Sequence, residues 1–383
     1  MRPVMLSSFG PPALACIRSW GKQGWKPGLI CIRSENESEP VSRYLSGWTT
    51  LPHKKVYTDE GIEIVAEFLE KFNAGGITAI DEKISKWINQ HRDKLPQKTA
   101  VWLPDNLIID DVLSKKRQTE VAKAVGFEVL PTYLLNLKSN ISVKAEHFPL
   151  CLRPSEPGSS DFKVYIVSSQ EELVRFLQSL NIPAPIIAQP FKSLPNLVIH
   201  GARTHTGATL GIQGFLVSRK FESVTLTITP IALPPDIHQK CVDFTDAFNI
   251  VGNYHFELLF DPNTKSAYFL EINTRFGGTT AKVLPCGYDE PVIALESYGV
   301  KADIRQTIKP VVVSNKQALM KYLFYALTHR LSPLDYPDEP MLIKVCKTLR
   351  GFMTYKDDVL NVSDMRGSLA LYRGNLKAKL KFL

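Results

Sequence analysis

Four polar side chains stand within or just after two apolar segments and could together hold a divalent cation. Glu257 lies inside the apolar run at 254–260, and Glu271, Asn273 and Arg275 alternate along the next one. Because a strand points alternate side chains to one face, Glu271 and Asn273 are predicted to share a face, which Arg275 joins if the strand continues. Carboxylate and amide oxygens suit Mg²⁺, which is usually shared with substrate phosphates. The pattern therefore predicts a magnesium site with Glu257, Glu271 and Asn273 as metal ligands.

A plainer interpretation is that Glu257 faces solvent and that Glu271 pairs only with Arg275. Against it, a carboxylate on a buried strand is costly unless a cation neutralises it. Gly277 and Gly278 follow directly, and glycine lets the backbone come close to a ligand. The combined pattern favours the ligand site.

Two kinds of element must position these residues. The turn residues at 262–265 separate the two apolar segments and predict a short hairpin of 254–261 with 267–273. The first hundred residues alternate strands with amphipathic helices, which predicts a parallel sheet covered by helices. That rhythm comprises strands at 4–7, 28–32 and 76–80 and helices at 13–24 and 61–72. Further short strands are predicted between 150 and 228, with helices at 169–180 and 235–248, and no motif is placed beyond residue 300.

The hairpin resembles the carboxy-terminal half of the ATP-grasp fold, whose members carry an acid on one strand and Glu-x-Asn-x-Arg on its partner. Upstream, Lys115 opens a helix that ends at Gly126, and Val129–Thr132 follows as an extended exit, as in that family. The resemblance covers roughly residues 1–300. It implies an α/β protein with α+β lobes: an ATP-grasp fold preceded by a Rossmann-like domain similar to that of carboxylate-amine ligases. The expected domains are an N-terminal domain (1–106), a small lid subdomain (107–190), a carboxy-terminal subdomain with the metal site (191–320) and an extension (321–383).

The same resemblance implies a set of nucleotide-binding residues. Lys115 and Arg153 would face ATP phosphates, although Arg153 stands where lysine is usual, and Lys163 could assist them. A short phosphate loop is expected at 157–160. Adenine would meet the hinge at 186–191, with Gln189 and Phe191 as the contacts and Pro190 where an acid is usual.

The implied chemistry is activation of a carboxylate by ATP, with Mg²⁺ or Mn²⁺ as the metal. The acyl phosphate would be attacked by an amine, with an amino acid as one substrate, and ADP and phosphate would be released. Arg275 and Asn273 would act at the transferred phosphoryl group. Arg203 would grip a substrate carboxylate, or else belong to an exposed hairpin turn. Two alternatives stay open: an ATP-grasp kinase that phosphorylates a hydroxyl, and a nucleotide-binding protein without turnover.

Thr279, Thr280 and His255, near the predicted metal ligands in sequence, each allow a ligand-binding or a purely structural interpretation. Thr279 and Thr280 would donate hydrogen bonds to substrate or cap a helix that starts near Ala281. His255 is interpreted as a packed strand residue rather than a ligand.

Composition sets the remaining expectations. The chain has 383 residues, 44% hydrophobic, and a formal net charge of +8. No segment reaches the roughly 18 apolar residues of a membrane span, and no basic stripe interleaved with aromatic residues indicates nucleic-acid binding. The six cysteines form no C-x-x-C pair, which favours buried thiols in a reducing cytoplasm. We expect a cytoplasmic enzyme with small-molecule partners, a homodimer by base rate, and a basic tail at 376–383 that is loose or makes a weak membrane or partner contact.

Overall fold

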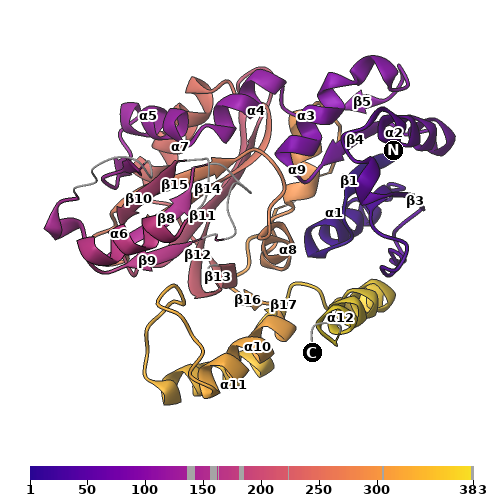
Figure 1. The fold of residues 1–383 in the computed structure, drawn as a ribbon. Coiled ribbons are helices and arrows are strands. Elements are labelled where there is room, and N and C mark those ends of the chain that lie inside the picture. Colours follow the sequence, from indigo (N-terminus) through magenta and orange to yellow (C-terminus); the bar gives the residue numbers. More distant parts are fainter. Residues whose placement is uncertain are drawn as a thin grey trace.

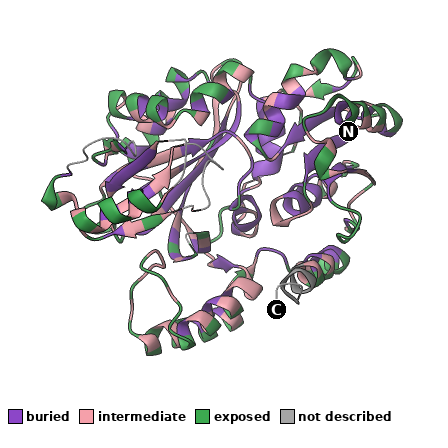
Figure 2. Ribbon diagram, in the orientation of Figure 1, coloured by how far each residue is buried: buried purple, intermediate pink, exposed green. Residues whose placement is uncertain are grey.

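The computed structural model describes residues 1–135, 143–155, 162, 164–180, 185–222, 224–303 and 306–380. It contains three sheets, which form an N-terminal domain, a small lobe and a large lobe (Figure 1). Buried residues line the strands, and exposed residues follow the outer faces of the helices (Figure 2). Among the described residues, no helix is both long and apolar enough to cross a membrane.

The N-terminal domain is a parallel five-stranded sheet in the order β3-β2-β1-β4-β5. Its strands are β1 (Pro3–Ser7), β2 (Gly28–Ile32), β3 (Gly47–Leu51), β4 (Gly76–Ala79) and β5 (Ala100–Val101). The helices are α1 (Pro11–Lys22), α2 (Asp59–Phe72) and α3 (Glu82–Gln90), and local sequence defines their starts. Thr58 caps α2 by accepting from Gly61 N, and Asp81 caps α3 by accepting from Lys83 N and Ile84 N. The predicted parallel sheet is confirmed.

The small lobe is an antiparallel sheet in the order β7-β10-β8-β9. It comprises β7 (Tyr133–Leu135), β8 (Leu150–Pro154), β9 (Tyr165–Val167) and β10 (Ile186–Pro190), with α6 (Gln170–Ser179) packed against them.

The large lobe is an eight-stranded sheet in the order β17-β16-β13-β12-β11-β14-β15-β6. Its strands are β6 (Glu128–Val129), β11 (Asn196–Arg203), β12 (Thr209–Phe221), β13 (Val224–Ile231), β14 (Gly252–Phe260), β15 (Ala267–Asn273), β16 (Val313–Ser314) and β17 (Lys356–Asp357). One face packs on α5 (Lys115–Ala124) and α7 (Pro235–Ala247) around buried Phe244, Phe256 and Phe269. The other packs on α8 (Thr280–Val283) and α9 (Glu290–Ser297).

Remaining helices are α4 (Asn106–Leu113), α10 (Lys316–Leu327), α11 (Met341–Thr354) and α12 (Met365–Leu380), with short 3₁₀ turns η1 (His53–Lys55), η2 (Arg92–Lys94), η3 (Ala145–His147), η4 (Leu284–Cys286) and η5 (Val362–Asp364). Two predicted domain limits differ from this arrangement. The limit at 320/321 falls inside α10. The stretch 107–129 packs into the large lobe, where Val121 and Phe127 share a core with Phe256, so the small lobe starts at β7 rather than at residue 107.

Candidate active site

The hairpin of β14 and β15 places the two acids opposite each other. Glu257 pairs with Glu271 and His255 pairs with Asn273 in the antiparallel register, and the register shifts directly after Glu257. Side chains of directly opposite residues lie on one face of the sheet. Asn273 Nδ2 donates to Glu271 Oε1 at 3.2 Å, so the amide and the carboxylate already touch. The structure thus brings together the three predicted metal ligands.

Lys115 supplies the cation that faces this pair. It is the first residue of α5, whose N-terminus Ser114 caps by accepting from Arg117 N at 3.3 Å. The Lys115 ammonium donates to Glu271 Oε2 and forms an ion pair with it. Glu271 therefore pairs with Lys115 and not with Arg275, in contrast to the plainer interpretation of the sequence.

Gln118 fixes the distance between α5 and β15, and sequence reasoning missed it. Its side-chain amide donates to Ile272 O at 3.1 Å, and its carbonyl accepts from Ile272 N at 3.0 Å. The side chain is 1% exposed and takes the place of a further strand beside Ile272. Lys115 lies one helical turn before it and is thereby held over Glu271. A lone Gln in a helix gives no sequence signal for this role.

The two acids have different pKa values because their surroundings differ. Burial raises the pKa of Glu257, and the charge of Glu271 adds to the rise. Burial also acts against the charged form of Glu271, but the cations Lys115 and Arg153 outweigh it and hold the pKa of that carboxyl well below its usual range. Glu271 has an ion-pair partner, whereas Glu257 forms no ion pair within the described residues, so a divalent cation between the two carboxylates would favour the charged form of Glu257.

The donor set fits Mg²⁺ when substrate oxygens complete the shell. In the part of the chain that the structure describes, no cluster of three or more His, Cys, Asp or Glu side chains is arranged to hold a metal. Two carboxylates and one amide are few ligands for an all-protein cage, but they match an ion that keeps water and phosphate oxygens as its other ligands.

Arg153 extends from the small lobe toward the same acids. Its Nη2 donates to Gln189 Oε1 at 2.9 Å, and Gln189 Nε2 donates to Thr132 Oγ1 at 2.9 Å. This chain of hydrogen bonds links β8 and β10 and orients the guanidinium, whose charge lowers the pKa of both Glu257 and Glu271. Gln189 thus positions Arg153, while its predicted contact with adenine stays a prediction.

The structure describes one of the other predicted nucleotide contacts, Phe191, and leaves the rest outside the described residues. Phe191 follows β10, and its backbone N–H donates to Pro149 O at 2.7 Å; its ring is partly buried. A contact between this ring and adenine stays a prediction. Lys163 and the phosphate loop at 157–160 lie outside the described residues.

Arg275 is bound to the N-terminal domain. Its Nε donates to Glu82 Oε2 at 2.6 Å, and its Nη2 lies 3.4 Å from Asn273 Oδ1. Glu82 is the buried first residue of α3, and burial raises its pKa while Arg275 opposes the rise. The next residue, Phe276, packs into a core formed with α1 and α9. Arg275 therefore links the predicted metal site to the N-terminal domain.

Arg203 has a different environment from the one expected. Its Nε donates to Asp246 Oδ1 at 2.7 Å and its Nη1 to Ile250 O at 3.0 Å. Because Glu257 lies opposite Val198 and strand faces alternate, Arg203 belongs to the face that α7 covers. The structure assigns Arg203 to the joint between β11 and α7, away from the acidic pair, and this corrects the expectation of a substrate grip.

A buried polar network lies behind the acids on the same face of the sheet. His200 Nδ1 is 3.2 Å from Glu290 Oε2, and His200 Nε2 is 3.0 Å from Thr279 Oγ1. Asn253 Nδ2 donates to Glu290 Oε1 at 3.2 Å. Burial opposes the charge of Glu290, but His200 outweighs it and lowers the pKa of Glu290. These residues are far apart in sequence and only their shared face relates them to Glu257.

His255 and the two threonines close this network against the turn after β15. The His255 ring stacks on His200 with centroids 5.4 Å apart, and burial lowers the pKa of His255 to about 3, so the ring is neutral near pH 7. Thr280 Oγ1 accepts from Gly277 N at 3.0 Å, and Thr279 contacts His200. Thr280 thus binds the turn and Thr279 binds His200 of β11, and His255 is packed within the strand, as the sequence predicts.

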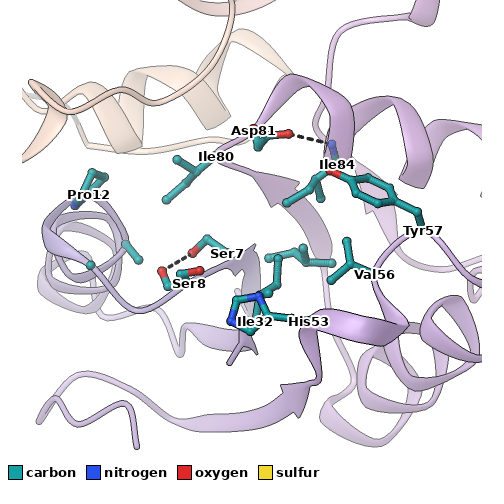
Figure 3. Close-up of a pocket in the computed structure, with 13 residues that line it drawn as sticks. Ser7, Ser8, Pro12, Ile32, His53, Val56, Tyr57, Ile80, Asp81 and Ile84 are labelled. Carbon is teal, nitrogen blue, oxygen red and sulfur yellow. Dashed lines mark hydrogen bonds between the residues drawn. The ribbon is translucent and has the colours of Figure 1, made fainter. Parts of the chain in front are cut away.

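A cavity of about 520 Å³ lies in the N-terminal domain at the carboxyl ends of β1, β2 and β4, next to the start of α3. The strand order reverses direction between β1 and β4, the place where open α/β sheets bind ligands. Figure 3 shows Ile32, Val56, Ile80 and Ile84 around a mainly aliphatic space, with the Asp81 carboxylate bonded to the start of α3. Asp81 directly precedes Glu82, the partner of Arg275.

These three sheets, with the acidic hairpin facing the small lobe, define an ATP-grasp fold with an N-terminal α/β domain, as the sequence predicted. A scan against protein-family models gives no match for this sequence, and no curated protein matches it. Solved structures do match. An N5-carboxyaminoimidazole ribonucleotide synthetase in complex with ADP has a TM-score of 0.66 at 12% identity, covering 92% of this chain and 97% of that chain.

Two other similar structures come from named bacteria. Biotin carboxylase from Campylobacter jejuni, in a β-γ-ATP complex, has a TM-score of 0.62 at 15% identity over 81% of this chain and 74% of that chain. The L-amino acid ligase from Bacillus licheniformis has a TM-score of 0.60 at 15% identity over 82% of this chain and 78% of that chain. At these identities the similarity shows the fold.

Proposed function

We propose that this protein is an ATP-dependent ligase that joins a carboxylate to an amine through an acyl phosphate. The observation that carries the proposal is the in-register pair Glu257 and Glu271, which touches Asn273 and faces Lys115 and Arg153. Acids suited to a metal and cations suited to phosphates lie together, and several of the solved structures with a similar fold hold ATP or ADP. One of these, a biotin carboxylase domain dimer from Hydrogenobacter thermophilus, contains magnesium ADP, at a TM-score of 0.61 and 15% identity.

Glu257, Glu271 and Asn273 would hold Mg²⁺, which supplies neutralising charge to the triphosphate when bound. Lys115 now neutralises Glu271. With Glu257 and Glu271 bound to a divalent cation, the Lys115 ammonium would be free to bind a phosphate oxygen. Arg153, which is hydrogen-bonded to Gln189, would reach the same oxygens from the small lobe. The residues thus cancel negative charge and hold the reactants in line, which is most of what phosphoryl transfer requires of a protein.

The reaction balances without a protein nucleophile. A carboxylate oxygen of the acid substrate attacks the γ-phosphorus, the bond to the bridging oxygen breaks, and ADP leaves. The amine lone pair then attacks the carbonyl carbon, phosphate leaves, and the amine nitrogen loses one proton. Arg275 lies beside Asn273 and would stabilise negative charge on the transferred group.

We infer that the N-terminal cavity receives one of the two substrates. Its lining is largely aliphatic, which favours an apolar side chain such as that of a hydrophobic amino acid. The amino-acid ligase among the similar structures supports an amino acid as a substrate. The predicted homodimer stays a prediction that sedimentation equilibrium would test.

The decisive experiment incubates the purified protein with ATP, Mg²⁺ and hydroxylamine across a panel of acids, with and without amines. A ligase releases ADP only with its acid and traps that acid as a hydroxamate. The variants Glu257→Gln and Glu271→Gln should each lose activity by about 10²-fold or more, the usual scale for removal of an electrostatic contact. Glu120→Gln, an exposed change on α5, is the matched control and should leave the rate unchanged.

Other products would refute the assignment. A phosphorylated hydroxyl without hydroxamate would identify a kinase. Tight ATP binding with no ADP release from any acid and amine combination would identify a nucleotide-binding protein without turnover.

A further inference from the structure

Apolar side chains form exposed stripes on two helices of the carboxy-terminal end. On α10, Met320, Phe324 and Leu327 follow the i, i+4, i+7 spacing of one helix face, and they are 60%, 53% and 57% exposed. On α11, the corresponding stripe contains Leu342 and Met353, which are 74% and 81% exposed. The opposite face of α10 packs on β12 and β13 through buried Leu319 and Tyr322, so these stripes are not turned inward.

The start of α12 continues the same pattern. Val362 in η5 is 88% exposed, and Met365 and Leu369 in α12 are exposed at the following turns. Of the 20 large hydrophobic residues that are exposed among the described residues, 12 lie between 308 and 369. Single exposed apolar residues are ordinary on a protein surface, but such concentration marks an interaction surface.

Positive charge is concentrated in the same region. Residues 308–383 hold 13 Lys and Arg against 6 Asp and Glu, a formal charge of +7 out of +8 for the whole chain. The first 307 residues are therefore almost neutral. A charge asymmetry of this size indicates a polyanionic partner.

Three exposed arginines are available to such a partner. Arg330 follows α10, Arg350 lies on α11, and Arg366 lies on α12 between Met365 and Leu369. None of the three arginines forms an ion pair within the described part of the chain. Arg350 and Arg366 thus share helices with the apolar side chains, and the Arg330 guanidinium lies 5.7 Å from the centroid of the Phe324 ring.

The surface is held in place by buried contacts. Lys316 Nζ donates to Gly351 O at 2.9 Å and to Phe352 O at 2.7 Å, which fixes α10 against the end of α11. Arg18 of α1 pairs with Asp364 at 2.8 Å, and both side chains are buried. In Figure 1, α10, α11 and α12 form the lower edge of the molecule, below the sheet and the N-terminal domain.

We propose that α10, α11 and the start of α12 form a docking surface for an anionic lipid bilayer. Helices with an apolar stripe beside Lys and Arg lie in the membrane interface, where the stripe enters the acyl boundary and the cations meet acidic headgroups. A second copy of this chain fits the surface poorly, because it would bring Arg330, Arg350 and Arg366 against the same three exposed arginines. The largely aliphatic stripes also lack the rows of aromatic residues on which nucleic-acid bases stack.

The test is flotation of the full chain with vesicles of neutral phosphatidylcholine and with vesicles that contain 30% phosphatidylserine. We expect binding to the anionic vesicles that weakens as salt rises and is far weaker on neutral ones. Arg350→Gln with Arg366→Gln should reduce partitioning about 25-fold, since each cation near such a surface is worth about fivefold. Lys71→Gln, an exposed change on α2, is the matched control for charge.

Leu342→Ser with Met353→Ser tests the apolar contribution and should reduce partitioning at least tenfold. Leu107→Ser with Leu134→Ser removes exposed apolar side chains, 82% and 62% exposed, outside the carboxy-terminal helices and should change nothing. Circular dichroism and the thermal midpoint establish that each variant is folded. Equal binding to neutral and anionic vesicles, or none to either, overturns the proposal. So does a dimer that the α11 variant dissociates, or binding to single-stranded RNA in place of vesicles.

Discussion

Replacing Lys115 by Met removes the cation that pairs with Glu271, and we expect this change to lower stability and to alter the response to Mg²⁺. Two unit charges about 4 Å apart attract by about 4 kcal/mol at an effective dielectric constant of about 20. The side chains of Lys115 and Glu271 are each 25% exposed, so solvent weakens the pair. We expect a loss of about 1.5–3 kcal/mol in the free energy of unfolding, the range of a hydrogen bond between charged groups.

The same variant should respond more strongly to Mg²⁺. In the natural protein the ion has to displace the Lys115 ammonium from Glu271, whereas in the variant both carboxylates are open to it. Denaturant unfolding with and without Mg²⁺, but without nucleotide, should therefore show a larger Mg²⁺ stabilisation in the variant. With nucleotide the order reverses, because Lys115 is lost as a phosphate contact, and turnover should fall by about 10²-fold.

Lys116 provides the matched control. It is the adjacent residue on α5, its side chain is 88% exposed, and its contact with Glu120 is 4.0 Å. Lys116→Met should change stability by less than about 0.5 kcal/mol. If the two variants have the same stability and the same response to Mg²⁺, then Lys115 does not neutralise Glu271 and the interpretation of the site is wrong.

Three other changes probe the elements around the acids. Gln118→Leu leaves two buried backbone groups of Ile272 unpaired and should cost about 2–4 kcal/mol, measured by denaturant unfolding, with faster hydrogen exchange at Ile272 N. Gly277→Ala places a Cβ 2.7 Å from the His255 ring and should cost about 1–3 kcal/mol, whereas Gly278→Ala, with no atom within 4 Å, should be neutral; equal effects would contradict the packing. The lowered pKa of Glu290 gives stability that is present above its unfolded pKa and lost as pH falls through the folded one, so Glu290→Gln should flatten the acid limb of the stability curve below about pH 4.5; an unchanged slope would exclude this contribution.

The acidic hairpin could be predicted because its information is local. Alternating apolar residues and a turn at 262–265 predict the two paired strands. Regular pairing from Leu258 and Phe269 would place Glu257 opposite Leu270, and the register shift after Glu257, which has no sequence signal, places it opposite Glu271 instead. The helix that Lys115 opens was predicted for a similar reason, since Gly126 ends it. When that helix packs against the hairpin, as the predicted fold requires, Lys115 contacts Glu271.

Contacts between distant segments could not be predicted in this way. Gln118 with Ile272, and His200 with Glu290, join residues separated by 154 and 90 positions, and each partner alone is an ordinary residue for its element. For Arg203 the predicted position, facing the cleft, differs from the observed one beside α7. Its place near the cleft was inferred from the order of elements, but the face of β11 on which it lies depends on the register with β14.

Arg275 makes a contact that the spacing of the motif does not predict. The sequence places it with Glu271 and Asn273 as a phosphate ligand, and the structure adds a charged bond to Glu82 of the N-terminal domain. Asp81, one residue earlier, caps α3 and lines the cavity of Figure 3. A substrate that enters this cavity would contact the start of α3, and any shift there acts on the guanidinium beside Asn273. The proposed substrate site and the proposed phosphate site are therefore linked by the ion pair of Arg275 with Glu82, which connects the last residue of the motif to another domain as well as to Asn273.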